Sequence, residues 1–347
     1  VTLDLEETVD SVDVVSTGIK YLEEKLPVGG LEKKRFYLIG GSSGVGKSLF
    51  LNQMMANAVK NNTYKNNDEK DTFLYITAEN LIGESLVRFY CSLTGERNRE
   101  VLYKLRKNKF IRKFHNKEIT EDELKQYDAD PNTELFDFSD DIKSILDSTS
   151  SDVVFKYVQA RRTTIRDIES IIDSVAMQKN LKGVFIDYLD LIISRHDFPD
   201  ERIMLGEVAQ FFKNSSVTYN IPVVSATQLN REGYNPKSTP SLVQMSESMK
   251  KIDPSDAVMF LQNTDDSHCS VNIGNGTKAI CKKIRVTLLK NRNGPIGETG
   301  FLIIPEKTDD HYNKDIFSFS IYDLPKINDD SNLPIDSDDY YNFFTQV

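Results

Sequence analysis

Gly41-Ser42-Ser43-Gly44-Val45-Gly46-Lys47-Ser48 satisfies the phosphate-binding pattern G-x-x-x-x-G-K-[ST] at every required position. The pattern is informative only where a buried strand precedes it and a helix follows it. The apolar run 36–39 predicts the strand, and apolar residues between positions 49 and 59 recur at helical spacing. Backbone N–H groups in such a loop face phosphate oxygens, aided by the positive end of the helix dipole. The stretch therefore predicts that the chain binds a nucleoside triphosphate.

Two residues of this loop have predicted roles beyond the backbone. We expect Lys47 to neutralise the β and γ phosphates and Ser48 to ligate Mg²⁺. A second carboxylate that orients the metal is expected from Asp187, which ends the apolar strand 183–187. Parallel strands present their carboxyl ends at one edge of a sheet, so Asp187 would emerge beside the loop. ATP and Mg²⁺ are the cofactors that these residues predict.

Polar side chains also follow two other predicted strands. Glu79 comes just after the strand 72–77, which we expect to neighbour the phosphate-loop strand. Its carboxylate can orient and polarise an attacking water, or it can serve as an acid in the first turn of a helix. Gln228 follows the strand 221–226 and can hydrogen-bond the γ phosphate. Both residues are candidates for the hydrolytic site.

A pair of cations ends a later strand. Lys290 and Arg292 are separated by one residue, so their side chains point to the same face of the strand that covers 284–289. The chain then turns and returns through 301–304, which predicts a hairpin. We expect both cations to act in trans on the nucleotide of a neighbouring subunit, where an arginine stabilises transition-state charge. The alternative is a solvated basic edge that deters sheet aggregation.

Composition restricts the class of protein. The chain has 347 residues, and 39% of them are hydrophobic, which suffices for one large α/β domain or two small ones. No stretch approaches the roughly 18 apolar residues that span a bilayer, so we expect no membrane partner. Three cysteines without metal-ligand spacing favour a reducing, cytoplasmic location. The net charge of -10 argues against non-specific coating of nucleic acid but not against a locally basic channel.

Changes in composition predict the organisation of the chain. Residues 1–15 are acidic and weakly periodic, as in a linker or arm, and 16–324 read as one α/β domain with a parallel sheet. Within it, 97–152 read as a charged helical elaboration. Residues 325–347 read as an acidic flexible tail, whose aromatic residues either dock on a partner or pack back on the body. The strands are expected at 36–39, 72–77, 153–158, 183–187, 221–226, 257–261, 284–289 and 301–304.

A stretch rich in Gly, Pro and Ser with several basic residues covers 230–252, directly after Gln228. A loop of this kind can hold a phosphate backbone through Lys, Arg and main-chain N–H groups, independently of base sequence. Taken by itself, the stretch also fits an ordinary surface loop. The sequence therefore indicates a nucleic-acid contact here only in combination with the other motifs.

In this order the motifs resemble the RecA-like motor domain of DnaB-type hexameric replicative helicases, most closely those of tailed bacteriophages. The likeness covers roughly residues 16–305. It rests on Ser16-Thr17-Gly18, Gly29-Gly30-Leu31, the phosphate loop, Glu79, Ile186-Asp187-Tyr188-Leu189, Ser225-Ala226-Thr227-Gln228-Leu229-Asn230-Arg231, Ser246-Glu247-Ser248 and Asp256. The most specific match is Lys290-Asn291-Arg292-Asn293-Gly294-Pro295-Ile296-Gly297.

The resemblance implies a P-loop NTPase fold with a mostly parallel central sheet flanked by helices and a C-terminal β-hairpin. It also implies a homo-hexameric ring that hydrolyses ATP at subunit interfaces, translocates 5′ to 3′ on single-stranded DNA and unwinds duplex. Lys47, Ser48 and Asp187 then hold Mg-ATP, Glu79 activates water, Gln228 senses the γ phosphate, and Lys290 and Arg292 act in trans. The implied DNA contacts are Asn230, Arg231, Glu247 and Ser248. Bacterial members typically have Arg and a small residue beside the Glu-Ser pair, where this chain has Ser246 and Met249, so we expect Lys250 and Lys251 to substitute for them.

The family usually carries an N-terminal helical collar that engages primase, and residues 1–15 cannot form one. We expect either a piece of a longer protein or a motor without a collar, with primase, a helicase loader or other replisome proteins as further partners. Two other functions share the motifs. One is a strand-exchange recombinase filament, and the other is an ATP-binding switch whose hydrolysis is indifferent to DNA.

Overall fold

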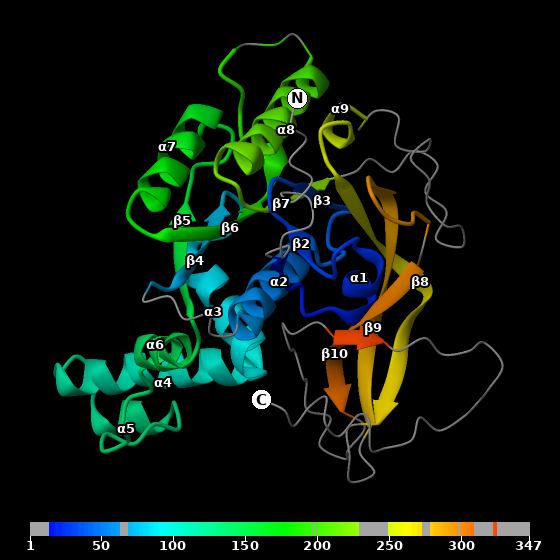
Figure 1. Cartoon of the computed structure of the whole chain (residues 1–347). Coiled ribbons are helices and arrows are strands. Elements are labelled where there is room, and N and C mark those ends of the chain that lie inside the picture. Colours follow the sequence, from blue (N-terminus) through cyan, green and yellow to red (C-terminus); the bar gives the residue numbers. More distant parts are fainter. Residues whose placement is uncertain are drawn as a thin grey trace, which may run out of the picture.

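The computed structural model describes residues 14–62, 69–196, 198, 200–228, 249–272, 278–297, 299–308 and 322–324. All eight predicted strands belong to one sheet, which has nine strands among these residues (Figure 1). Its order is β11 (Tyr322–Leu324), β10 (Thr299–Thr308), β9 (Lys278–Asn291), β8 (Ala257–Asn272), β3 (Phe36–Gly41), β7 (Val223–Gln228), β6 (Asn180–Asp187), β4 (Asp71–Thr77) and β5 (Ser151–Tyr157). The strands from β8 to β5 run parallel, and β8 to β11 pair antiparallel.

Alternate residues of β3 enter two different hydrophobic cores. Tyr37 and Ile39 face the core that includes helices α1 (Lys20–Lys25), α2 (Lys47–Asn61) and α3 (Ile82–Thr94). Phe36 and Leu38 face the opposite core, built with α7 (Ile165–Ala176) and α8 (Glu201–Thr218). A strand covered on both faces must be apolar throughout, which is why 36–39 is a continuous apolar run. The expected fold, a mostly parallel sheet flanked by helices, is confirmed.

The segment 97–152 is largely helical, as expected. It contains α4 (Asn98–His115), α5 (Glu121–Lys125) and α6 (Phe138–Ser148), which lie together below α3 in Figure 1. Asn108 lies on the buried face of α4. Its amide N–H donates to the Phe136 carbonyl at 2.5 Å, and its amide oxygen accepts from the Phe136 N–H at 3.1 Å. Thr120 caps α5 with a capping box that includes Glu123.

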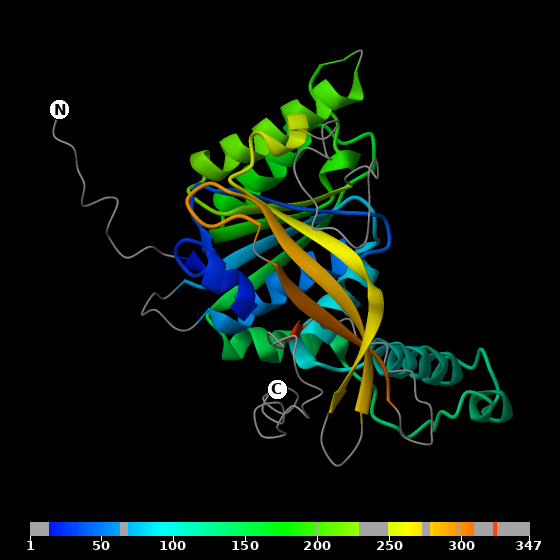
Figure 2. The ribbon, with the colours of Figure 1, turned by 90° about the vertical axis from the view of Figure 1, so that its right-hand side faces the viewer.

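The predicted C-terminal hairpin is confirmed as β9 and β10, which pair antiparallel, and both strands are longer than expected. β8 extends beyond Leu261, the last residue paired with β3, and β9 pairs with it antiparallel over most of its length. Figure 2 shows this ribbon running down past the central sheet to the level of α4. β10 returns alongside β9 after the turn at Gly294-Pro295.

The predicted neighbour of the phosphate-loop strand is wrong. β3 lies between β7 and β8, while β4 lies between β6 and β5, so two strands separate β4 from β3. The later strands β6 and β7 insert into the gap left by the crossover through α2. Buried apolar runs identify which strands are central, but they do not give the lateral order of those strands.

The expected boundary after residue 15 is also corrected. Val14–Val15 form strand β1, which pairs with β2 (Leu31–Glu32), and the Val15 side chain is buried. This end of the predicted arm is therefore part of the domain. The predictions for residues 1–13, for the tail 325–347 and for Asn230, Arg231, Glu247 and Ser248 lie outside the described residues.

Candidate active site at the carboxyl edge of the sheet

The predicted nucleotide-binding residues meet at one edge of the sheet. Gly41, the first residue of the loop, is paired with Gln228 across β3 and β7. Thr77, at the end of β4, is paired with Asp187 at the end of β6. Both pairs stand at the carboxyl ends of parallel strands, the edge at which α/β folds place their ligands. Although two strands separate β4 from β3, Glu79 follows the carboxyl end of β4 and therefore lies at the same edge of the sheet as the phosphate loop.

The phosphate loop has the backbone that a phosphate cradle needs. Gly44 and Gly46 have φ angles of 73° and 106°, and a Cβ on Gly44 would meet nothing within 4 Å. The Lys47 ammonium donates to the carbonyl oxygens of Gly41 at 3.0 Å and Ser42 at 2.8 Å, so it lies across the loop. Burial lowers the pKa of Lys47, and the nearby carboxylates, Asp190 foremost, oppose that shift. A phosphate would supply the anionic partner that this ammonium has only in part.

Ser48 and Asp187 are in direct contact. The Ser48 hydroxyl donates to Asp187 Oδ1 at 2.8 Å, and the Asn80 amide donates to the other carboxylate oxygen at 3.2 Å. Asp187 is 1% exposed, and burial raises its pKa while the Ser48 hydrogen bond lowers it. A hydroxyl and a carboxylate are oxygen donors of the kind that Mg²⁺ prefers, and such sites complete the shell with phosphate oxygens and water. These two residues therefore fit a Mg²⁺ ion held jointly with a nucleotide.

Glu79 lies on the solvent side of this pair. Its side chain is exposed, and its Oε2 is 3.5 Å from the Ser48 hydroxyl. Its carboxylate is thus open to water and adjacent to the predicted metal position. This is the geometry that a water-orienting carboxylate requires.

Lys290 and Arg292 lie at the opposite edge of the sheet. Asn291, between them, pairs with Ala257, which pairs in turn with Tyr37 near the start of β3. The length of β3 therefore separates these cations from the phosphate loop of the same subunit. The Lys290 ammonium donates to the carbonyls of Ile252 and Asp253 at 3.1 and 2.9 Å. Burial lowers the pKa of Lys290, and the neighbouring Arg292 charge acts in the same direction.

Most of the chain matches one protein family. Residues 14–309 match the DnaB-like helicase C-terminal domain. The chain belongs to this family. The particular likeness to bacteriophage members stays a prediction.

Relatives described as replicative DNA helicases are similar to part of this chain. The chain is 28% identical over 153 residues to the replicative DNA helicase DnaB of Mycoplasma pneumoniae, which covers 43% of this chain and 32% of that protein. It is 31% identical over 154 residues to a probable replicative DNA helicase of Trieres chinensis, covering 44% of this chain and 32% of that protein. The matched part is about a third of each relative.

Two solved structures share the fold. One is a DnaB-like replicative helicase described together with its interactions with primase, with a TM-score of 0.62, 15% identity and coverage of 93% of this chain and 68% of that one. The other is the ATPase domain of G40P, with a TM-score of 0.60, 17% identity and coverage of 92% and 96%. Among the residues described, no helix has the length and apolarity needed to cross a membrane.

The DnaB-like domain contains a polar cluster that the sequence analysis missed. Asp190, in the short 3-10 turn η2 (Leu189–Leu191), accepts from the Thr227 hydroxyl at 2.7 Å and the Gln228 N–H at 3.0 Å. Lys251, on α9 (Met249–Ile252), donates to Asp190 at 2.6 Å and to the Gln228 carbonyl at 2.8 Å. Asp190 follows directly after the motif Ile186-Asp187-Tyr188-Leu189, but no local pattern pairs a carboxylate with a lysine 61 residues away. This cluster joins the predicted γ-phosphate sensor to α9.

Lys251 lies in a buried ion pair, and its role as a DNA contact stays a prediction. Its side chain is 9% exposed, and the ion pair with Asp190 and the Gln228 carbonyl occupy the ammonium. Breaking this pair would remove the cationic partner of a largely buried carboxylate, so a contact of Lys251 with DNA would cost free energy. Its neighbour Lys250 is exposed and stays a candidate for DNA contact.

The two adjacent lysines give a matched test of the stability that this ion pair contributes. We expect Lys251→Met to destabilise the domain by about 3 kcal/mol, the lower end for breaking a buried ion pair, because Asp190 keeps two other donors. Lys250→Met should change stability by less than about 0.5 kcal/mol and weaken binding of single-stranded DNA. Urea unfolding of both variants measures the difference. Equal stability of the two would mean that the Lys251–Asp190 pair contributes little.

Proposed function

We propose that this DnaB-like domain is the ATP-driven motor of a replicative DNA helicase. The observation that supports the proposal is that the predicted site residues lie at two opposite edges of the sheet. The phosphate loop, Ser48, Asp187 and Glu79 meet at the carboxyl edge, and the pair Lys290–Arg292 lies at the other. A head-to-tail ring would bring the second edge of one subunit to the first edge of the next.

In the proposed site, the residues at the carboxyl edge bind and orient ATP. The loop N–H groups and Lys47 hold the phosphates, and Ser48 and Asp187 hold Mg²⁺. The ion would neutralise charge on the phosphate oxygens. Glu79 orients a water for in-line attack on the γ phosphorus and accepts its proton, since its carboxylate is exposed beside the metal residues.

The cations at the far edge complete the site of the neighbouring subunit. Arg292 supplies a guanidinium to the γ phosphate of that subunit, and Lys290 supports it. Neither cation can reach its own phosphate loop, because β3 stands between them. Hydrolysis thus requires assembly, and we propose the hexameric ring of the family.

Gln228 and its surroundings connect the nucleotide with DNA. Its N–H and carbonyl are held by Asp190 and Lys251, so loss of the γ phosphate at the Gln228 side chain can be transmitted to α9. We propose that the segment between Gln228 and α9 contacts single-stranded DNA, with Lys250 at its end. Asn230, Arg231, Glu247 and Ser248 are the further proposed contacts. Translocation is proposed to run 5′ to 3′.

Primase, a helicase loader or other replisome proteins are the proposed protein partners, and the acidic tail 325–347 is the proposed docking segment. The interactions with primase described for the similar helicase structure are those of that protein, and they motivate primase as a candidate here. A cytoplasmic location follows from this role. These partners extend the motor proposal and do not affect its chemistry.

The decisive experiment measures ATP hydrolysis with and without single-stranded DNA, followed by unwinding of forks with a 5′ or a 3′ tail. We expect stimulation by DNA and unwinding of forks that carry a 5′ tail. DNA-stimulated hydrolysis without unwinding would favour a strand-exchange filament. Hydrolysis indifferent to DNA would favour an ATP-driven switch and overturn the motor.

A further inference from the structure

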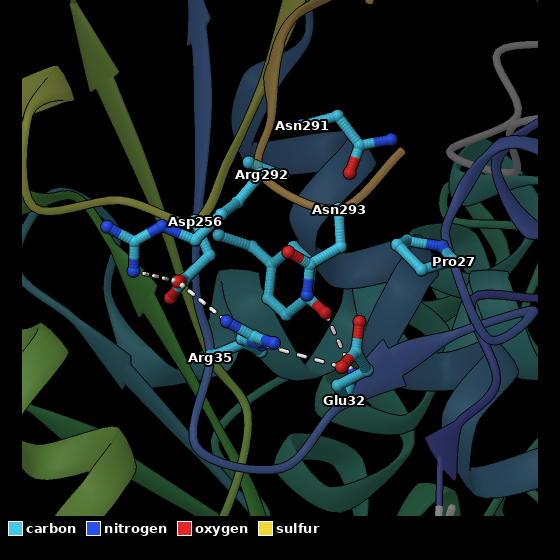
Figure 3. Close-up of a pocket in the computed structure, with 9 residues that line it drawn as sticks. Pro27, Glu32, Arg35, Asp256, Asn291, Arg292 and Asn293 are labelled. Carbon is cyan, nitrogen blue, oxygen red and sulfur yellow. Dashed lines mark hydrogen bonds and ion pairs between the residues drawn. The ribbon is translucent and has the colours of Figure 1, made fainter. Parts of the chain in front are cut away.

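Asp256 stands directly before β8 and is surrounded by cations. Its Oδ1 accepts from Arg35 and Arg292, each at 3.2 Å, and its Oδ2 accepts from Lys213 at 2.6 Å. The carboxylate also accepts the Phe36 N–H at 2.9 Å, at the start of the phosphate-loop strand. Figure 3 shows Arg292 and Arg35 approaching Asp256 from two sides. One carboxylate thus serves three cations.

The three cations differ in how far they are exposed. Asp256 is 4% exposed, and Arg35 and Lys213 are 24% and 17% exposed, whereas Arg292 is 57% exposed. Arg35 and Lys213 alone are sufficient to neutralise the buried carboxylate. The hydrogen bond from Arg292 therefore adds little to the stability of the buried carboxylate. Its main effect is to restrict the orientation of the Arg292 side chain.

The backbone that carries Arg292 is already fixed. The Arg292 N–H donates to the Asp256 carbonyl at 2.9 Å. The Asn291 amide donates to the carbonyls of Lys25 at 3.0 Å and Pro295 at 3.2 Å, which holds the turn that follows β9. Only the long side chain of Arg292 remains to be oriented. The adjoining cavity of about 10 Å³ has room for about one water molecule.

We propose that Asp256 is a positioning residue that orients Arg292 for the nucleotide of the neighbouring subunit. This inference rests on the trans-acting role of Arg292 proposed above. Asp256 accepts a hydrogen bond from Nη1 of Arg292, and among the described residues this is the hydrogen bond found for the guanidinium, whose side chain is 57% exposed. A long cation fixed in direction before the neighbour arrives loses less freedom when it meets the phosphate, which favours catalysis.

Asp256→Asn tests the proposal because it keeps the size of the side chain and removes the charge that holds Arg292. We expect kcat for ATP hydrolysis to fall by about 10- to 100-fold, with KM for ATP nearly unchanged, because the nucleotide is bound at the other edge. Asp147→Asn is the matched control, since it removes an ion-paired carboxylate at the surface, and it should leave kcat unchanged. An unchanged kcat in Asp256→Asn would overturn the inference.

Mixed assemblies separate positioning in trans from damage to the fold. Subunits with Asp256→Asn keep an intact phosphate loop, and subunits with Lys47→Ala keep an intact Arg292 and Asp256. In a mixture of the two slow variants, some interfaces combine the intact phosphate loop of an Asp256→Asn subunit with the intact Arg292 and Asp256 of a Lys47→Ala subunit. Hydrolysis by the mixture should therefore exceed the sum of the two separate preparations. Damage within the Asp256→Asn subunit would leave no intact site, and the absence of recovery would then overturn the inference.

The same mixture made with Arg292→Ala and Lys47→Ala tests the proposed function by itself. Failure of that mixture would overturn the trans-acting role of Arg292. Recovery there without recovery for Asp256→Asn would overturn only the inference about Asp256. If Asp256→Asn does not fold, Asp256→Glu is the second variant. It keeps the negative charge beside Arg35 and Lys213, but its longer side chain shifts the position of the Arg292 guanidinium. It should show the same loss of kcat and the same recovery in mixtures. Wild-type kcat in a folded Asp256→Glu protein would contradict the proposal.

Discussion

Lys47→Ala is expected to reduce ATP hydrolysis by at least about 10²- to 10³-fold, the cost of losing one charged donor to the transferring phosphoryl group. The Lys47 ammonium bonds two carbonyls of its own loop at 3.0 and 2.8 Å, so it already lies where the phosphates would bind. Steady-state hydrolysis with saturating DNA measures the loss. Binding of a fluorescent ATP analogue should weaken in parallel, because the lysine contacts bound and transferring phosphates alike.

The fold should tolerate this change. Burial lowers the pKa of Lys47, which means that its surroundings disfavour the charge that the substitution removes. The thermal unfolding midpoint of Lys47→Ala should therefore match or exceed that of the wild type without nucleotide. Lys109→Ala, which removes an exposed lysine of α4, is the control and should keep full hydrolysis. Substantial hydrolysis by Lys47→Ala with unchanged nucleotide affinity would contradict the assignment of the phosphate loop.

Arg292→Ala is expected to lower hydrolysis by about 10³-fold or more while nucleotide binding persists. The reason is position, since Arg292 is at the end of the sheet away from its own phosphate loop, and the proposed target is therefore the nucleotide of a neighbouring subunit. Equilibrium nucleotide binding and single-turnover hydrolysis, measured on assembled protein, separate the two effects. Arg292→Lys should recover little, because an ammonium cannot bond Asp256 and a phosphate in the forked geometry of a guanidinium.

Stability should change little in Arg292→Ala. The side chain is 57% exposed, and Asp256 keeps its bonds to Arg35 and Lys213. We expect a change of less than about 1 kcal/mol in the free energy of unfolding, as for an exposed ion pair. Arg195→Ala, which breaks the surface pair with Glu169, is a suitable control for the loss of one guanidinium. Full hydrolysis by Arg292→Ala would show that the trans-acting assignment is wrong.

Much of the site at the carboxyl edge was predictable because its signals are local. The phosphate loop, Asp187 and Glu79 each sit at the end of an apolar strand, and parallel strands bring such ends together whatever their lateral order. For this reason the wrong neighbour predicted for β3 did not misplace Glu79, which lies 3.5 Å from Ser48 across that edge. The fold class followed from the same alternation of apolar strands and helices.

Local patterns did not predict which of two adjacent lysines is exposed and free to contact DNA. Lys250 and Lys251 are adjacent and chemically alike, yet one is exposed and the other is buried against Asp190. The free energy of a buried charge depends on its partner, and that partner lies 61 residues away in the chain. A sequence pattern over a few residues cannot contain such a pairing.

Short patterns along the chain were enough to predict a phosphate-binding loop and a metal-orienting carboxylate, because backbone geometry and residue type fix both signals locally. The position of Lys290 and Arg292 relative to that loop, and the contact of Asp256 with Arg292, emerged from the folded domain alone. The physical reason is that strand order and long-range ion pairs come from packing of the whole sheet. Distance across the sheet is what makes a neighbouring subunit necessary for the proposed chemistry.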